Sequence, residues 1–271
     1  MKELSEFLKE TEFCDYKNLE IKKIADYYKY EFTDKRELAV KLFEFVRDEI
    51  KYKVGPWNKK ASTTLRDKAG MCTNSTNLLV ALCRAVGIPA GYFIYRVKGG
   101  ESFGHIIPEL IKSPLKKHSV HIICGVYLNH WIKCDPSTDK DLSSKTKHIS
   151  KITNLVEWNG ENDSVHDINP EHIIEIIGPL ANIDYQMKKK PRYIVRKYIF
   201  RIGNYYIDFL RSEGIKINSH KDIELQFSEW IKDRKKLLFY KYKIMYKFFV
   251  IKHNLSYNFK KTWKHVKRKT F

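Results

Sequence analysis

Long hydrophobic runs are missing from this 271-residue sequence. Nowhere do about 18 apolar residues follow one another, so the sequence predicts no transmembrane helix. The first residues, MKELSEFLKETEF, carry acidic side chains where a secretory signal peptide needs an uninterrupted apolar stretch. We therefore expect a cytoplasmic protein.

Cysteine is scarce, and its count is odd, which does not suit a framework of disulfide bonds. Reduced thiols in a cytoplasmic compartment fit better, because most of these cysteines stand in apolar or strand-like surroundings. A glycine-rich phosphate loop, a zinc finger and an RNA-binding aromatic signature are also missing from the sequence. Their absence argues against sequence-specific nucleic-acid binding. The five cysteines are Cys14, Cys72, Cys83, Cys124 and Cys134.

What the chain does contain is typical of a globular protein, with 43% apolar and 14% aromatic residues. Its net charge of +19 is unevenly spread. Gln186–Phe271 holds 24 Lys and Arg against 6 Asp and Glu, whereas Met1–Tyr185 holds 27 against 26. We therefore predict two regions, a near-neutral domain over residues 1–185 and a basic, aromatic-rich helical extension over residues 186–271.

The basic extension is predicted to contain helices over roughly Arg192–Arg211 and Asp222–Ile251. Within the second, Lys236, Lys243 and Lys247 share one helical face. Such a surface suits an acidic protein partner such as an acyl carrier, an anionic membrane surface or nucleic acid. A compositional bias of the source genome toward Lys and Tyr, combined with helix packing on the first region, would explain the aromatic residues as well.

In the near-neutral region the pattern places helices first and strands after them, which predicts an α+β fold. Apolar spacing marks the helices, and Thr33 or Asp34 is the expected cap of the second. A polar connecting segment, Ser143–Pro170, follows the strands. The predicted helices are Ile21–Glu31, Asp34–Ile50, a short one around Thr63–Asp67, and one that begins at Cys72; the predicted strands are Lys51–Val54, Ala90–Val97, Val120–Leu128 and Trp131–Cys134.

Cys72 stands at the start of the most strongly amphipathic helix of the chain, directly after Gly70 and Met71. A helix N-terminus stabilises a thiolate through its dipole and its free N–H groups, and the thiolate is the nucleophilic form of cysteine. The backbone N–H of Cys72 would also serve as an oxyanion donor. We therefore predict that Cys72 is a nucleophile. The cysteines at 83, 124 and 134 lack such a setting and are predicted to be core thiols.

A nucleophilic cysteine needs a base, and the hairpin formed by the last two strands offers one. The tight turn at Asn129–His130 can bring His121 and Asp135 side by side, where the carboxylate would orient the imidazole ring. His118 competes for the role of base but is expected on the opposite face of its strand. A zinc site can also be drawn from His118, His121, His130 and Cys134, although this spacing matches no familiar zinc module.

Two blocks of the sequence resemble the transglutaminase-like superfamily, whose papain-type fold packs N-terminal helices on an antiparallel sheet. The first block is Lys60–Leu65, Gly70–Cys72 and Leu78–Ala90, and it is similar to the segment that carries the family's nucleophile. The second runs from His121 to Leu128, then Trp131 and Asp135–Ser137, and it is similar to the family's histidine and aspartate strands. The resemblance covers roughly residues 35–140 and does not extend to the last 85 or so.

The resemblance implies that Cys72 is the nucleophile, His121 the base and Asp135 the orienting acid. It also implies an upstream side chain at the oxyanion hole, for which Trp57 is the nearest candidate, and His105 is expected in the wall of the substrate groove. The family usually has an aromatic residue two positions after its histidine and an acidic one four positions after it. Ile123 and Gly125 stand there in this sequence, which leaves the substrate groove undetermined.

The sequence thus predicts cysteine-dependent acyl transfer. The substrate would be a peptide, an amide or an acyl thioester, and the acceptor would be water or an amine. Such a Cys–His pair needs no metal and no organic cofactor. The alternative is a non-catalytic transglutaminase-like module that recruits an anionic partner through its basic extension.

Overall fold

The computed structural model describes residues 2–109, 118–188, 193–212, 217–219, 221–234, 237, 240, 241 and 244. Its helices are α1 (Lys2–Glu6), α2 (Leu19–Glu31), α3 (Lys35–Glu49), α4 (Ala61–Asp67), α5 (Cys72–Ala85), α6 (Gly99–Phe103), α8 (Lys140–Thr146), α9 (Asp184–Met187) and α10 (Tyr193–Arg211), with short 3₁₀ turns η1 (Gly104–Ile106), η2 (Lys151–Thr153) and η3 (Pro170–His172). Its strands are β1 (Lys51–Tyr52), β2 (Ala69–Gly70), β3 (Ala90–Lys98), β4 (His118–Tyr127), β5 (Trp131–Cys134) and β6 (Ile173–Leu180).

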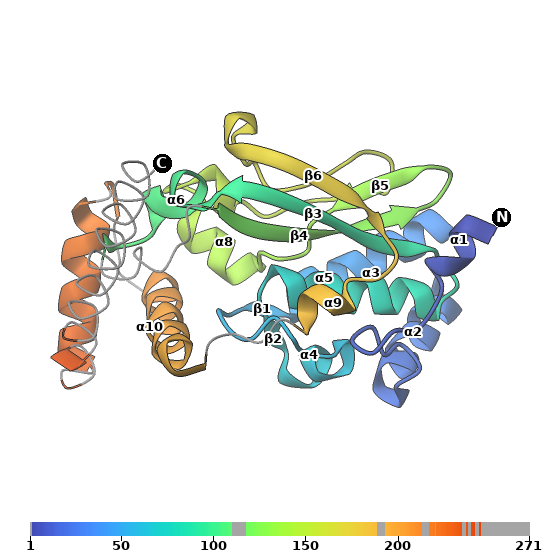
Figure 1. Ribbon diagram of the computed structural model, residues 1–271, viewed down its shortest axis with the longest axis horizontal. Coiled ribbons are helices and arrows are strands. Elements are labelled where there is room, and N and C mark those ends of the chain that lie inside the picture. The colour runs from blue at the N-terminus through green and yellow to red at the C-terminus, as the bar shows by residue number, and fades with distance from the viewer. Residues whose placement is uncertain are drawn as a thin grey trace, which may run out of the picture.

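Four of the strands form an antiparallel sheet in the order β5-β4-β3-β6, and β1 pairs separately with β2 in parallel. Figure 1 shows the sheet as one layer and α3 and α5 as a second layer against it. The strands β3, β4 and β5 follow one another along the chain and are neighbours in the sheet, as hairpin connections favour. The predicted α+β class, with N-terminal helices packed on an antiparallel sheet, is confirmed.

Helix α5 lies at the centre of the core, because every residue from Cys72 to Arg84 is buried. A helix that is buried on all sides needs protein on every face. The sheet supplies one face through the alternate residues Tyr92, Ile94, Ile122 and Cys124, which join the α5 cluster. The residues between them point to the other side of the sheet, where Phe93, Tyr95 and Ile123 pack with Ile152 and Ile168. The sheet therefore has two covered faces.

Most predicted elements occur within a few residues of their expected bounds. Asp34 is the cap of α3, since its side chain accepts from the Glu37 N–H at 2.9 Å. β6 was not predicted, because isoleucines stand on both of its faces, at 173 and 177 on one and at 174 and 176 on the other, and so do not give the alternation of a half-buried strand. The segment Ser143–Pro170 was predicted only as a connector, yet it holds most of α8 and all of η2.

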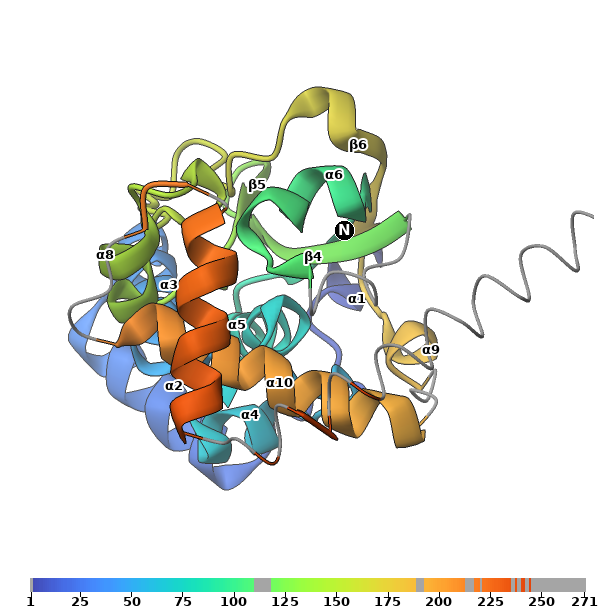
Figure 2. The same cartoon turned by 90° about the vertical axis from the view of Figure 1, so that its left-hand side faces the viewer.

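The basic extension does fold into helices where the structure describes it. The predicted helix Arg192–Arg211 is α10, and residues 221–234 form a further helix, drawn in orange, which crosses α10 in Figure 2. The predicted face of Lys236, Lys243 and Lys247 lies outside the described residues. α10 shares a hydrophobic cluster with Tyr52 and with Leu142 of α8, so it packs directly on the first region.

None of the helices within the described segments combines the length and the apolar character needed to cross a membrane. All five cysteines are buried and free. The predicted division at residue 185 and the predicted compartment remain predictions.

Candidate active site

Cys72 is the first residue of α5, and the turn before it is shaped by close packing. A Cβ atom on Gly70 would lie 2.5 Å from the Cβ of Asn74, so only glycine fits there. Asn74 in turn uses its amide on both sides of the turn. Its Oδ1 accepts from the Met71 N–H at 3.1 Å, and its Nδ2 donates to the Trp57 carbonyl at 3.1 Å. The turn and the upstream loop are therefore fixed relative to the helix start.

The edge of β4 brings His121 to this helix start. β5 pairs with β4 only over Cys124–Tyr127. Among the described strands, none therefore pairs with the β5 side of β4 at Ile122. Here α5 supplies the partners instead: Thr76 Oγ1 donates to the Ile122 carbonyl at 2.9 Å, and the Ile122 N–H donates to the Cys72 sulfur. His121 precedes Ile122 and contacts Cys72 by a side-chain hydrogen bond.

Asp135 completes the group from the end of β5. Its Oδ2 lies 2.5 Å from His121 Nε2, and its Oδ1 accepts from the Ser137 N–H at 3.1 Å. The carboxylate is fully buried, whereas Cys72 and His121 keep exposed fractions of 7% and 8%. Solvent thus reaches only the reacting end of the group, and the three predicted side chains are in contact.

The electrostatics of the three groups favour an ion pair. Burial opposes the thiolate of Cys72, but the charge and hydrogen bond of His121 outweigh it and lower the pKa of Cys72 below its usual value. Burial also opposes the imidazolium, yet Asp135 and Cys72 raise the pKa of His121 well above its usual value. Despite its burial, Asp135 has a lowered pKa, because the His121 imidazolium and hydrogen bonds from His121 and Ser137 stabilise its charge. A thiolate facing an imidazolium follows from these directions.

A second histidine, His166, was missed in the sequence because it lies in the polar connector and belongs to no motif. It is buried, and its Nε2 lies 3.2 Å from Ser137 Oγ, 3.0 Å from Thr138 Oγ1 and 3.7 Å from Asp135 Oδ2. Burial lowers the pKa of His166, so the ring is neutral at pH 7 and acts through hydrogen bonds. It approaches the same carboxylate oxygen of Asp135 that His121 contacts, and the centroids of the two imidazole rings are 6.0 Å apart.

Tyr52 was also missed, although the strand that carries it was predicted. Burial raises the pKa of its phenol, and the negative charges of Cys72 and Asp135 raise it further. The phenol therefore lies within electrostatic reach of both groups and stays protonated, ready to donate a hydrogen bond. Only the pairing of Tyr52 with Gly70 reveals this position, and that pairing depends on the folded chain.

For Trp57 and His105, the two remaining predicted site residues, the structure gives the position of the backbone. Trp57 is half-buried, and its carbonyl oxygen is the acceptor of Asn74. The backbone of His105 lies in η1, while its side chain lies outside what the structure describes. An oxyanion role for Trp57 and a groove role for His105 remain predictions.

The structure also bears on the alternative base, the alternative zinc site and the predicted core thiols. His118 and His130 are exposed, whereas His121 is buried against Asp135, so these three side chains do not converge. Among the core thiols, Cys83 and Cys124 have strongly raised pKa values because of burial, and Cys134 has a raised one for the same reason. They are core thiols, as predicted.

The two positions that depart from the family pattern are packed away from the site. A Cβ on Gly125 would lie 2.4 Å from the Phe93 ring and 3.3 Å from Trp131, which explains the glycine. Ile123 is fully buried in the same cluster as Phe93. Neither position is free to carry a polar side chain toward a substrate.

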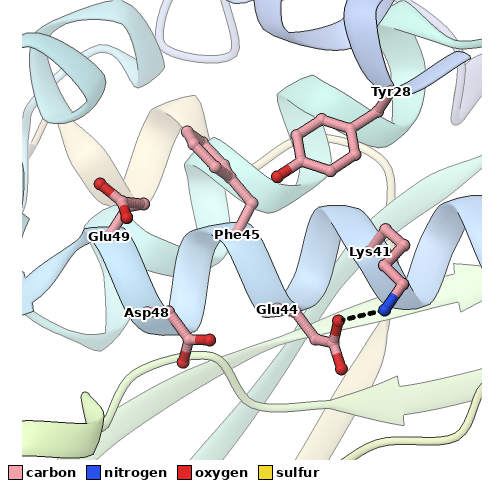
Figure 3. Close-up of a pocket in the computed structure, with 6 residues that line it drawn as sticks. All are labelled: Tyr28, Lys41, Glu44, Phe45, Asp48 and Glu49. Carbon is pink, nitrogen blue, oxygen red and sulfur yellow. Dashed lines mark hydrogen bonds and ion pairs between the residues drawn. The ribbon is translucent and has the colours of Figure 1, made fainter. Parts of the chain in front are cut away.

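A pocket elsewhere on the surface is made by α2 and α3, as Figure 3 shows, and is lined by Tyr28, Lys41, Glu44, Phe45, Asp48 and Glu49. Its three carboxylates already have cationic partners, since Glu44 pairs with Lys41, Asp48 with Arg47 and Glu49 with Lys68. No residue of the Cys72 group lines it. The pocket is a surface of ion pairs rather than a second candidate site.

Comparisons with known proteins give a family-model match and a similar solved structure. No curated protein sequence matches the chain. Among solved structures, a candidate cysteine protease from Cytophaga hutchinsonii is similar, with 19% identity and a TM-score of 0.40. The match covers 66% of this chain and 52% of that chain, so this chain spans about half of its length. Residues 22–136 match the family model of the transglutaminase-like superfamily core, a range that includes Cys72, His121 and Asp135. Residues 22–136 are therefore similar to the core of the transglutaminase-like superfamily.

Proposed function

We propose that the protein is a cysteine-dependent acyl-transfer enzyme with Cys72 as nucleophile, His121 as general base and acid, and Asp135 as the group that orients the ring. One observation carries the proposal: the buried contact from Asp135 through His121 to Cys72, which lowers the pKa of the thiol and raises that of the ring. The similarity of residues 22–136 to the transglutaminase-like superfamily supports cysteine-based catalysis in general, and the reaction itself is our proposal.

In the first half-reaction, the Cys72 thiolate attacks the acyl carbon of an amide or thioester. Negative charge develops on the acyl oxygen, which the Cys72 N–H and a donor from Tyr52 or Trp57 would stabilise. His121 gives its proton to the departing amine or thiol as the bond to the acyl carbon breaks, and a thioester to Cys72 remains. In the second half-reaction, His121 takes a proton from water or an amine, which attacks this thioester and releases Cys72.

An acyl-thioester probe, followed by intact mass and peptide mapping, tests the proposal. We expect one acyl adduct, located on Cys72 and absent from Cys72→Ser. His121→Ala should slow its formation by about a hundredfold, since proton transfer by a positioned general acid contributes about 10² or more. Cys14→Ala serves as control, because burial raises the pKa of Cys14 to about 11 and removes it from the reaction. Equal labelling of all five cysteines would contradict the proposal.

The basic extension motivates a narrower proposal about the substrate. An acyl group delivered on an acidic carrier protein would be attracted by the charge of residues 186–271. Lys→Glu exchanges at Lys260, Lys261 and Lys264 should then weaken binding of an acidic acyl carrier, and so should 1 M salt. Binding that survives both changes would refute the carrier.

A further inference from the structure

The strand β1 has different partners along its two edges. On one edge it pairs with β2, where Tyr52 stands opposite Gly70 and the Lys53 N–H donates to the Gly70 carbonyl at 2.8 Å. On the other edge lies α10, as Figure 1 shows. Its Asn204 accepts from the Val54 N–H at 2.9 Å through Oδ1 and donates to the Val54 carbonyl at 2.8 Å through Nδ2. The side-chain amide of Asn204 thus bonds both the N–H and the carbonyl of Val54, as the backbone of a neighbouring strand would.

A second set of hydrogen bonds, from Arg211 of α10 and from Asp139 at the cap of α8, holds the backbone of Tyr52. The Tyr52 N–H donates to Asp139 Oδ2 at 2.7 Å, and the Tyr52 carbonyl accepts from Arg211 at 3.2 Å. Arg211 and Asp139 bind each other at 2.6 Å, which closes a ring of three groups. Their side chains are only 12% and 2% exposed. Loss of one partner would leave the other charge buried and poorly compensated.

The packing around these clamps is apolar. Ile202 and Tyr206 of α10 belong to the cluster that includes Tyr52 and Val54. The Tyr206 hydroxyl also donates to the Ile106 carbonyl in η1. Helix α10 therefore contacts two segments of the first region, one of which leads through β1 and β2 to the turn at Cys72.

We infer that α10 belongs to the catalytic unit, with Asn204 and Arg211 as positioning residues for β1. They hold the Tyr52 phenol near Cys72. Because Tyr52 pairs with Gly70, they also fix the turn that places Cys72 in contact with His121. Neither residue touches the reacting atoms. The inference rests on the proposed function and adds that the segment beyond the family match is needed for it.

The rate at which iodoacetamide alkylates Cys72, measured as a function of pH, tests the inference apart from any acyl chemistry. Asn204→Leu removes both bonds to Val54 while it keeps the side-chain size. We expect alkylation at pH 7 to slow by up to about thirtyfold, the ratio that two net hydrogen bonds correspond to. The midpoint of the pH profile should move up toward that of an ordinary thiol. Arg211→Lys keeps a cation beside Asp139 and should retain most of the wild-type rate, whereas Arg211→Ala should not.

Arg201→Ala is the matched control, because Arg201 lies on the same helix with an exposed side chain. Circular dichroism confirms folding, and every variant is assayed at least about 15 °C below its own unfolding midpoint, so that lost stability alone does not change the profile. A wild-type alkylation rate and pH midpoint in folded Asn204→Leu would overturn the inference and leave the proposed function intact. A wild-type protein that is alkylated selectively at Cys72 but never acylated by the thioester probe would overturn the proposed function. In that case the Asn204→Leu profile still decides whether α10 positions Cys72.

Discussion

Gly70→Ala introduces a single methyl group at the tightest point of the turn before Cys72. The new carbon would lie 2.5 Å from the Cβ of Asn74 and 3.3 Å from its Oδ1. Because Asn74 is anchored in a buried helix, either its side chain or the β1–β2 pair must move. Overpacking of this kind costs about 1–3 kcal/mol. Losing the Asn74 bonds to Met71 and Trp57 adds about 1 kcal/mol for each bond, so we expect the free energy of unfolding to fall by about 3–5 kcal/mol.

Urea unfolding, followed by tryptophan fluorescence, measures this loss. The control is Gly100→Ala, since nothing lies within 4 Å of a Cβ at Gly100 and alanine favours the helix α6 in which it stands. Folded Gly70→Ala should also be alkylated at Cys72 several-fold more slowly than wild type. Equal unfolding midpoints for the two glycine variants would refute the reasoning that the turn is shaped by contact with Asn74.

Three further predictions address charge, packing and pH. Asp135→Asn removes the charge that holds the pKa of His121 high, so acylation by the thioester probe should slow by about a hundredfold or more at pH 7 in stopped-flow assays. Gly125→Ala should lower the free energy of unfolding in urea by about 1–3 kcal/mol, because its Cβ would overlap the Phe93 ring. Burial raises the pKa of Cys83 well above 9.0, so its contribution to stability is complete below pH 9 and is lost as the pH rises further. Thermal unfolding midpoints that stay constant from pH 8 to 10.5 would contradict the last of these.

Much of the site could be predicted because its parts are encoded locally. Cys72 stands at a helix start marked by Gly70, and His121 and Asp135 flank a hairpin whose turn and alternation are legible in the sequence. Antiparallel pairing then brings two residues fourteen positions apart within 2.5 Å. Local signals were enough here because the structure keeps these side chains on neighbouring strands.

The residues that were missed depend on contacts between distant segments. Tyr52 reaches Cys72 through the parallel pair β1–β2, and His166 reaches Asp135 from a loop whose composition resembles a linker. The role of Asn204 depends on a contact across 150 positions. No periodicity or motif marks such contacts. The charge contrast correctly separates two compositions, but it does not reveal that α10 packs on the near-neutral region.

The proposed chemistry depends on a Cys72 thiolate paired with the His121 imidazolium. The most direct test is the pH dependence of iodoacetamide alkylation, resolved cysteine by cysteine by mass spectrometry in the wild type and in His121→Ala. We expect Cys72 to react faster than the other four cysteines at neutral pH, with a midpoint below the ordinary thiol value of 9.0, and we expect His121→Ala to return it toward that value. A Cys72 midpoint at or above 9.0 in the wild type would contradict the claim.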